Sequence, residues 1–159
     1  MTIFPFLNLY LVSACSKNQQ DTSLSSTTDS QEVVGLWDCI ERDGMSYPRL
    51  YVDEDAQDYL GDENVSKLFQ ILQLDINENN GGELISYFDV TESDGATYSF
   101  DFGMPITVKN NHPRYTIAAQ NEEGEDEIVF RCTLTNSGIL TCTYTDILEG
   151  SEGSINFLQ

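Results

Sequence analysis

Apolar and polar residues alternate in short stretches along most of the chain after residue 31, and turn-forming residues separate these stretches. A period of two is typical of β-strands that bury one face. The first stretch, residues 32–41, places Val33, Gly35, Trp37 and Cys39 on one face. We expect further strands over residues 46–54, 67–76, 83–92, 97–103, 104–110, 113–120, 127–135, 138–147 and 154–159.

About ten consecutive strands with short turns predict an all-β fold, an antiparallel up-and-down meander closed into a barrel that leaves no open edges. A two-sheet β-sandwich is the alternative. Residues 65–72 also have helical spacing, but the Asn/Gly-rich residues 77–82 that follow are typical of a hairpin loop and favour a strand. Residues 55–66 form an acidic connector in this interpretation.

The amino-terminal residues have the pattern of an export signal. Residues 3–12 are almost all apolar, and this run is shorter than the about 20 apolar residues that span a bilayer. The sequence Val12-Ser13-Ala14-Cys15 resembles the lipobox of bacterial lipoproteins. The resemblance implies cleavage after residue 14 and acylation of Cys15, with palmitate-type chains as the membrane anchor. No Lys or Arg precedes Cys15, and an apolar strand with an incidental cysteine is the alternative.

Residues 16–31 are rich in Ser, Thr, Gln and Asp, with Leu24 as the one large apolar residue. Such a composition cannot bury enough surface to fold, so we expect residues 15–31 to be an acylated, disordered tether. Residues 32–159 then form a single domain. In the lipoprotein family, the non-Asp residue Ser16 after the cysteine implies the outer membrane, facing the periplasm or the cell surface.

The charge limits the choice of partners. Seven Lys and Arg against 27 Asp and Glu give a formal net charge of −20. This charge repels nucleic acid and anionic lipid, and it attracts cationic proteins. Acidity that only keeps the protein soluble is the simpler explanation.

Gly35, Leu36 and Trp37 on the first strand resemble the G-x-W signature of lipocalins and related calycins. In that family the Trp closes the base of a barrel whose cavity holds small apolar molecules. Thr145 and Asp146 resemble a second signature, T-D-Y, but Ile147 replaces its Tyr. A third signature supplies an Arg over the Trp, and no Arg follows Arg131 to match it.

The resemblance implies an envelope binding protein for a small apolar ligand. The candidate cavity residues are aromatic side chains that we expect to face inward: Phe69, Tyr87, Phe100, Tyr115, Phe130 and Tyr144. The alternative function is binding of a protein, for instance inhibition of a basic envelope enzyme. Lysozyme-inhibiting lipoproteins carry an S-G-x-x-Y loop, and Ser137-Gly138 here is not followed by that Tyr. A structural envelope role is a third possibility.

The cysteines predict one disulfide, since the proposed compartment is oxidising. The loop at residues 136–138 suits a three-residue hairpin with Gly138 in a left-handed conformation, which sets Cys132 opposite Cys142. Cys39 is then the spare thiol, although it could replace either partner. We expect the spare thiol to be a buried small apolar side chain.

No catalytic, cofactor or metal motif is recognisable. The single histidine, His112, lies in a turn, and no nucleophile elbow or phosphate-binding loop is present. Asp75, Asn77 and Asn79 begin like a calcium loop, but Asn80 and Ser86 occupy the positions that require Gly and Glu. We therefore expect no enzyme, no cofactor and no metal site.

Overall fold

The computed structural model describes residues 33–159, so the predicted signal peptide, Cys15 and the tether lie outside the described residues. The described chain forms ten strands and one short helix. In chain order they are β1 (Gly35–Arg42), β2 (Met45–Ser46), β3 (Arg49–Val52), α1 (Glu54–Leu60), β4 (Val65–Ile76), β5 (Gly81–Glu92), β6 (Thr97–Asn111), β7 (Arg114–Gln120), β8 (Asp126–Leu134), β9 (Ile139–Asp146) and β10 (Glu152–Leu158).

Eight of these strands close into an antiparallel barrel in meander order. Each strand from β4 to β9 pairs with the strand that follows it in the chain. β1 closes the barrel by pairing with β10 on one side and with β4 on the other. The predicted all-β meander barrel is therefore confirmed, and the sandwich alternative is excluded. No helix in the described part of the chain is long and apolar enough to span a membrane.

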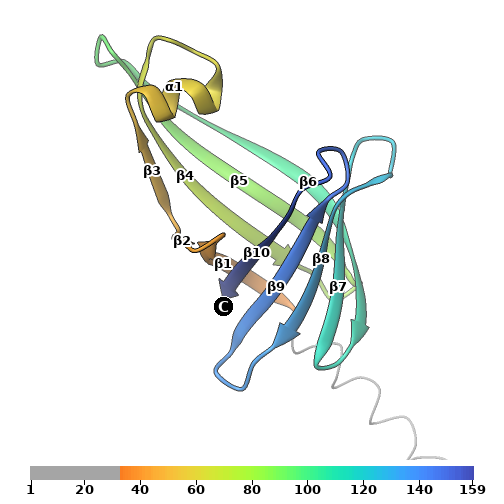
Figure 1. Cartoon of the computed structure of the whole chain (residues 1–159). Coiled ribbons are helices and arrows are strands. Elements are labelled where there is room, and N and C mark those ends of the chain that lie inside the picture. The colour runs from red at the N-terminus through yellow and green to blue at the C-terminus, as the bar shows by residue number, and fades with distance from the viewer. Residues whose placement is uncertain (1–32) are drawn as a thin grey trace, which may run out of the picture.

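Three strands are much longer than the barrel needs. β4 and β5 have 12 residues each and β6 has 15, because the segments 97–103 and 104–110 form one strand instead of the two that we expected. Their far halves extend beyond the barrel as a curved sheet that β3 joins at one side (Figure 1). We call this extension the wing, and the open end of the barrel beside it the mouth.

The helix α1 caps the wing at its tip (Figure 1). It begins at Glu54, the last residue of the strand expected over residues 46–54, and otherwise lies in the segment 55–66 that the sequence predicted to be a connector. Only Ala56 of the seven helical residues is buried. The sequence did not predict this helix because seven residues with one buried position show no helical period.

The protein has two hydrophobic cores. The larger one fills the barrel and includes Trp37, Leu74, Ile117, Leu140 and Phe157. The smaller one lies under α1 in the wing and includes Tyr51, Leu68, Phe88 and Val90. Among residues 33–159, most of the barrel interior is thus occupied by side chains, and a cavity lies towards the mouth.

The predicted disulfide is confirmed. Cys132 and Cys142 lie opposite each other on β8 and β9 with Cα atoms 4.0 Å apart, and their sulfur atoms are bonded. Gly138 in the intervening turn has a φ of 77°, as the three-residue hairpin requires. Cys39 is a free, buried cysteine on β1.

Candidate functional site: the barrel mouth

A β-bulge in β1 turns an arginine into the mouth. Cys39 pairs with Phe157 and Glu41 with Asn156, so that Ile40 is one residue more than β10 can match. Inward alternation from Trp37 and Cys39 would have pointed Arg42 outward. The extra residue reverses the alternation, so Arg42 lies beside the buried Ile155 and faces the barrel interior.

Arg42, Tyr144 and Asp43 form a hydrogen-bonded cluster at the mouth. The Nε and Nη2 atoms of Arg42 donate to the Tyr144 hydroxyl at 3.4 and 3.3 Å, and this hydroxyl donates to Oδ2 of Asp43 at 2.7 Å. The guanidinium carbon of Arg42 also lies 5.0 Å from the centre of the Tyr144 ring, within cation–π range. These contacts fix the direction of the arginine side chain.

The backbone holds Asp43 in place. Asp43 and Gly44 form the two-residue turn between β1 and β2, with φ values of 52° and 77°. The Ser154 amide donates to Oδ1 of Asp43 at 2.9 Å, and the Asp43 amide donates to the Ser154 carbonyl at 2.8 Å. Gly153 gives the cluster room, because a Cβ atom there would lie 2.6 Å from the Tyr144 ring.

The cluster stays charged at neutral pH. Partial burial alone would raise the pKa of Asp43, but the hydrogen bonds from Tyr144 and Ser154 and the charge of Arg42 lower it below its usual value. Burial alone would lower the pKa of Arg42, but its hydrogen bond to Tyr144 and the neighbouring groups raise it. Burial and the bond to Asp43 raise the pKa of Tyr144, so its hydroxyl stays protonated.

A cavity of about 170 Å³ lies beside this cluster. Its walls are mostly apolar, with one cationic, one anionic and two hydroxyl side chains among them. The lining residues are Arg42, Leu72, Leu84, Ser86, Phe102, Met104, Ile128, Phe130, Tyr144, Asp146 and Ile155. Such a lining with a few polar groups is typical of sites for small organic molecules.

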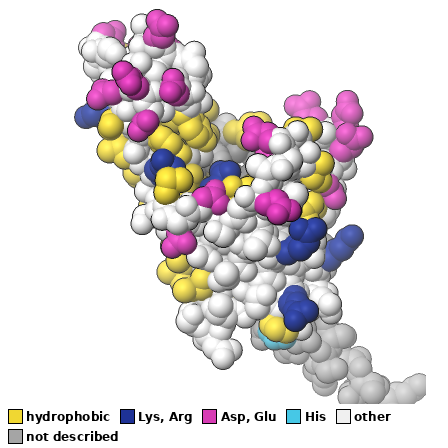
Figure 2. Space-filling view, viewed as in Figure 1, with side chains coloured by type: hydrophobic (Ala, Val, Ile, Leu, Met, Phe, Trp, Pro, Cys, Tyr) yellow, Lys and Arg dark blue, Asp and Glu magenta, His cyan; other side chains and the backbone are white. Residues whose placement is uncertain are grey.

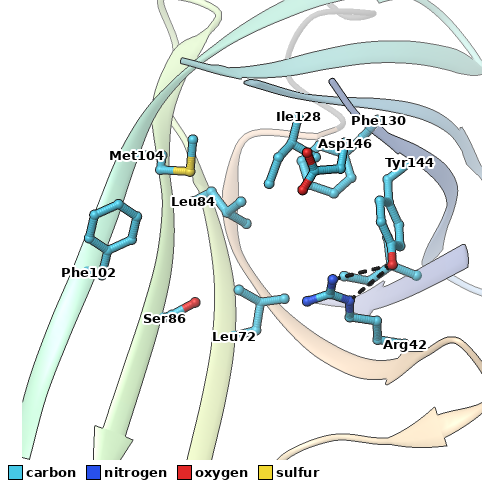
Figure 3. Close-up of a pocket in the computed structure, with 11 residues that line it drawn as sticks. Arg42, Leu72, Leu84, Ser86, Phe102, Met104, Ile128, Phe130, Tyr144 and Asp146 are labelled. Atoms are coloured by element: carbon cyan, nitrogen blue, oxygen red, sulfur yellow. Dashed lines mark hydrogen bonds between the residues drawn. The ribbon is translucent and has the colours of Figure 1, made fainter. Parts of the chain in front are cut away.

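One donor group of the arginine remains available in the cavity. Figure 3 shows the guanidinium with two nitrogens turned to Tyr144 and the third turned towards Leu72 and the open space. This third nitrogen, Nη1, makes no hydrogen bond to any of residues 33–159. Asp146 also lines the cavity, and it lies on β9 two residues from Tyr144 (Figure 3). The formal charges of Arg42, Asp43 and Asp146 sum to −1.

Four of the six predicted cavity residues face the inner side of the sheet, and two of them line the cavity. Phe130 and Tyr144 are among its walls. Tyr115 is 2 % exposed and packs in the barrel core. Phe100 lies on the wing, where its ring stacks on Phe88 at a centroid distance of 4.9 Å.

Phe69 and Tyr87 lie on the outer face, which corrects the prediction that they face inward. Phe69 stands opposite the exposed Leu50 on β3, and Tyr87 is 40 % exposed. Both alternating faces of β4 and of β5 carry large apolar residues. The sequence therefore could not show which face of these two strands is buried, and Leu68 and Phe88 occupy the inner side instead.

Trp37 is 1 % exposed and stands opposite Leu74, at the end of the barrel away from the wing. Its indole N–H donates to the Val33 carbonyl at 2.8 Å. Gly35 has a φ of 133° and lies against the Gln159 side chain, where a Cβ atom would clash. Within residues 33–159 the two arginine–ring contacts involve Tyr144 and Tyr51 and not Trp37.

His112 and Cys39, which the sequence analysis also considered, do not line the cavity at the mouth. His112 lies in the turn between β6 and β7 with its Nδ1 2.9 Å from the Tyr115 hydroxyl. Burial raises the pKa of the Cys39 thiol to about 12. Among residues 33–159, no group of three or more His, Cys, Asp or Glu could hold a metal ion.

The sequence did not single out Arg42, Asp43, Ser86 or Gly153. The one available signal was the Asp43-Gly44 dipeptide, which is typical of a tight hairpin turn directly after Arg42. No family model matches this sequence, and no curated protein matches it either.

Proposed function

We propose that the protein is a lipid-anchored envelope protein, held by acylated Cys15, whose barrel mouth binds a small and largely apolar molecule. The observation that carries this proposal is the apolar cavity with the Nη1 group of Arg42 turned into it. A donor with no protein partner at an apolar wall is suited to one acceptor atom of a ligand. The calycin resemblance of Gly35 and Trp37 supports the same class of function.

The size of the cavity limits how much of the ligand it can enclose. Sites for drug-sized molecules measure about 300–1,000 Å³, whereas a dry cavity of about 150 Å³ takes up benzene. The 170 Å³ at the mouth therefore suits one ring or a short chain. The rest of the molecule would lie against Phe102, which is 60 % exposed at the edge of the cavity.

The electrostatics favour a neutral ligand over an anion. Arg42 is balanced by Asp43, Asp146 lines the same cavity, and the chain carries a net charge of −20. A carboxylate or sulfonate would enter against this field. A carbonyl, ester or hydroxyl oxygen could accept a hydrogen bond from Arg42 without that cost.

Two fluorescent probes that share a ring system test these statements. N-phenyl-1-naphthylamine is neutral, and 1-anilinonaphthalene-8-sulfonate is its anionic counterpart. We expect the neutral probe to bind more tightly, with enhanced emission, and Ser86→Phe to abolish binding by filling the cavity. Ser99→Phe is the matched control, since it places the same side chain on the outer face of β6. Equal binding by wild type and Ser86→Phe would place the probe elsewhere and refute the site.

Displacement of the neutral probe then tests the role of Arg42. Methyl octanoate should displace the probe at a lower concentration than octanoate does. A hydrogen bond to a charged donor contributes about 1.5–3 kcal/mol, and partial exposure reduces this, so Arg42→Met should weaken the ester by about tenfold. Preference for octanoate would show that the mouth selects anions and would overturn the neutral-ligand statement.

A further inference from the structure

We propose that the first half of β6 binds an extended, basic polypeptide segment by strand addition. This surface adjoins the cavity proposed above, because Phe102 and Met104 of β6 also line that cavity, and it would require a protein partner of the envelope. We call residues 97–105 the free edge. It is the longest unpaired strand edge among residues 33–159, since the other sheet edges, β2 and β3, have only two and four residues.

The pairing pattern of β6 leaves this edge open. β6 pairs with β5 from Thr97 to Thr107, but it pairs with β7 only from Ile106 to Asn111. Pro105 stands where the second pairing stops, and it has no N–H to continue the ladder. On the β7 side, no strand of the described chain covers residues 97–105.

The directions of the backbone groups can be assigned. The Val108 amide donates to the Asn80 carbonyl on the β5 side at 2.8 Å, and the β5–β6 register has no bulge. Even-numbered residues of β6 therefore bond towards β5, and odd-numbered residues direct their N–H and C=O groups to the open side. Thr97, Ser99, Asp101 and Gly103 thus offer donors and acceptors in the spacing that an added strand requires.

The inner face along the free edge is apolar and exposed. The rings of Tyr98, Phe100 and Phe102 follow one another on alternate residues and are 42 %, 40 % and 60 % exposed. Across the mouth, the turn between β9 and β10 exposes Ile147 and Leu148. Figure 2 shows a hollow between the wing and this opposite rim, with apolar side chains on its walls.

The outer face beside the free edge is acidic, which favours a basic partner. Glu83, Asp89 and Asp101 are exposed on the outer face of β5 and β6. Acidic residues also gather at the wing tip and on the rim opposite (Figure 2). Residues 81–105, 121–127 and 147–152 contain no Lys or Arg. A strand with apolar residues towards Phe100 and Lys or Arg towards Asp101 complements both faces.

A second copy of the chain fits the free edge less well. Pairing two free edges would bring Asp89 and Asp101 of both copies together, and each copy carries a net charge of −20. Like charges opposite each other on neighbouring strands are destabilising. The partner that we infer is therefore an extended segment of another protein in which apolar and basic residues alternate.

The probe is a capped nine-residue peptide of alternating lysine and valine, added to the full chain at low salt. We expect binding that slows hydrogen exchange of the Ser99 and Asp101 amides by at least tenfold at saturation. Three control peptides should bind at least tenfold more weakly. In the first, glutamate replaces lysine; the second has the same residues in block order; the third is N-methylated at alternate positions.

Two variants test the edge itself. Ser99→Pro removes an edge N–H without breaking a backbone bond to β5, and it loses the bond from the Ser99 hydroxyl to Asp89, which Ser99→Ala loses as well. The proline variant should weaken the peptide by at least tenfold, whereas Ser99→Ala should change its affinity less than threefold. Trp37 emission and the melting temperature check that the proline variant folds. Asp101→Lys is the second variant, and it should weaken the lysine peptide while allowing the glutamate peptide to bind.

Four outcomes overturn the proposal. The first is that the lysine peptide does not bind at millimolar concentration. The second is that the block-order peptide binds as tightly as the alternating one, and the third is that the protected amides lie outside residues 97–105. In the fourth, the protein is a dimer that Ser99→Pro dissociates, which would make a second copy the occupant. Phe102 and Met104 belong both to the free edge and to the cavity lining, but Ser99 does not line the cavity. The neutral probe should therefore still bind the Ser99→Pro variant, and loss of peptide binding alone in this variant keeps the two proposals distinguishable.

Discussion

The buried side chain of Gln70 links the two cores, and its replacement by leucine gives a stringent test of the structure. Gln70 is 2 % exposed, and it is the one buried polar side chain among residues 33–159. Its Oε1 accepts from the Tyr47 hydroxyl at 3.1 Å and from the Tyr51 hydroxyl at 3.3 Å. Its Nε2 donates to the Tyr59 hydroxyl at 3.1 Å. Tyr47 belongs to the barrel core and Tyr51 to the wing core.

Gln70→Leu removes these three bonds and takes from the buried Tyr47 and Tyr51 hydroxyls the acceptor that they share. Burial raises the pKa of Tyr47, so its hydroxyl cannot relieve the loss by ionising. Each buried, unsatisfied hydroxyl costs about 1–3 kcal/mol, and the added apolar burial of leucine offsets roughly 1 kcal/mol. For two hydroxyls, we therefore expect the free energy of unfolding to fall by about 1–5 kcal/mol.

Urea unfolding followed by the fluorescence of Trp37, the single tryptophan, measures this change. Tyr47→Phe provides the second arm of a double-mutant cycle. In wild type, Tyr47→Phe should cost about 1 kcal/mol because it removes a buried hydrogen bond. In the Gln70→Leu background it should cost nothing or stabilise, since it removes an unsatisfied hydroxyl. Equal costs in both backgrounds, or a loss below about 1 kcal/mol for Gln70→Leu, would refute this account of the link.

Three further predictions concern the cysteines and the mouth. Replacing Cys132 and Cys142 by alanine should lower the free energy of unfolding by about 2–3 kcal/mol, because the disulfide closes a loop with a sequence separation of 10. Urea midpoints measure this change, and an unchanged midpoint would contradict it. In a Cys15→Ser protein at pH 8, Cys39 should react with dithionitrobenzoate only after unfolding, because burial raises its pKa to about 12; fast reaction of the native protein would show an open thiol. The pKa of Asp43 lies below its usual 3.8 in the folded protein, so its stabilising effect is present above pH 3.8 and disappears as the pH falls through the folded value. Asp43 is 37 % exposed, so Asp43→Asn should cost less than about 1 kcal/mol at pH 6. The urea midpoints of the two proteins should converge as the pH falls below 3.8, and a gap that widens in acid would contradict this sign.

The local sequence pattern predicted most of the strands and the disulfide between Cys132 and Cys142. Period-two alternation predicted the strands, and the loop at residues 136–138 set the register that joins Cys132 to Cys142. These features depend on residues that are close in sequence, and turn chemistry fixes them before any distant contact forms. The short helix α1 was not predicted because it shows no helical period. The strand β6 was predicted as two strands, and Gly103 and Pro105, which usually mark a break, lie inside the one continuous strand.

The residues of the mouth depended on contacts between distant segments. Arg42 faces the cavity only because β1 has one residue more than β10 can pair, and a bulge is a property of two strands together. Phe69 and Tyr87 face outward because pairing with β3 and closure of the barrel chose between two apolar faces of β4 and β5. A one-residue shift in register exchanges these faces.

The sequence by itself determined an antiparallel β-fold, a cross-strand disulfide and a strongly acidic surface. Only the tertiary structure decided that the barrel is mostly filled, that its remaining space lies at the mouth beside Arg42, and that residues 97–105 of β6 keep an open edge. The physical reason is that alternation shows that a strand has two faces, whereas burial of a face, and pairing of an edge, depend on strands that lie far away in the sequence.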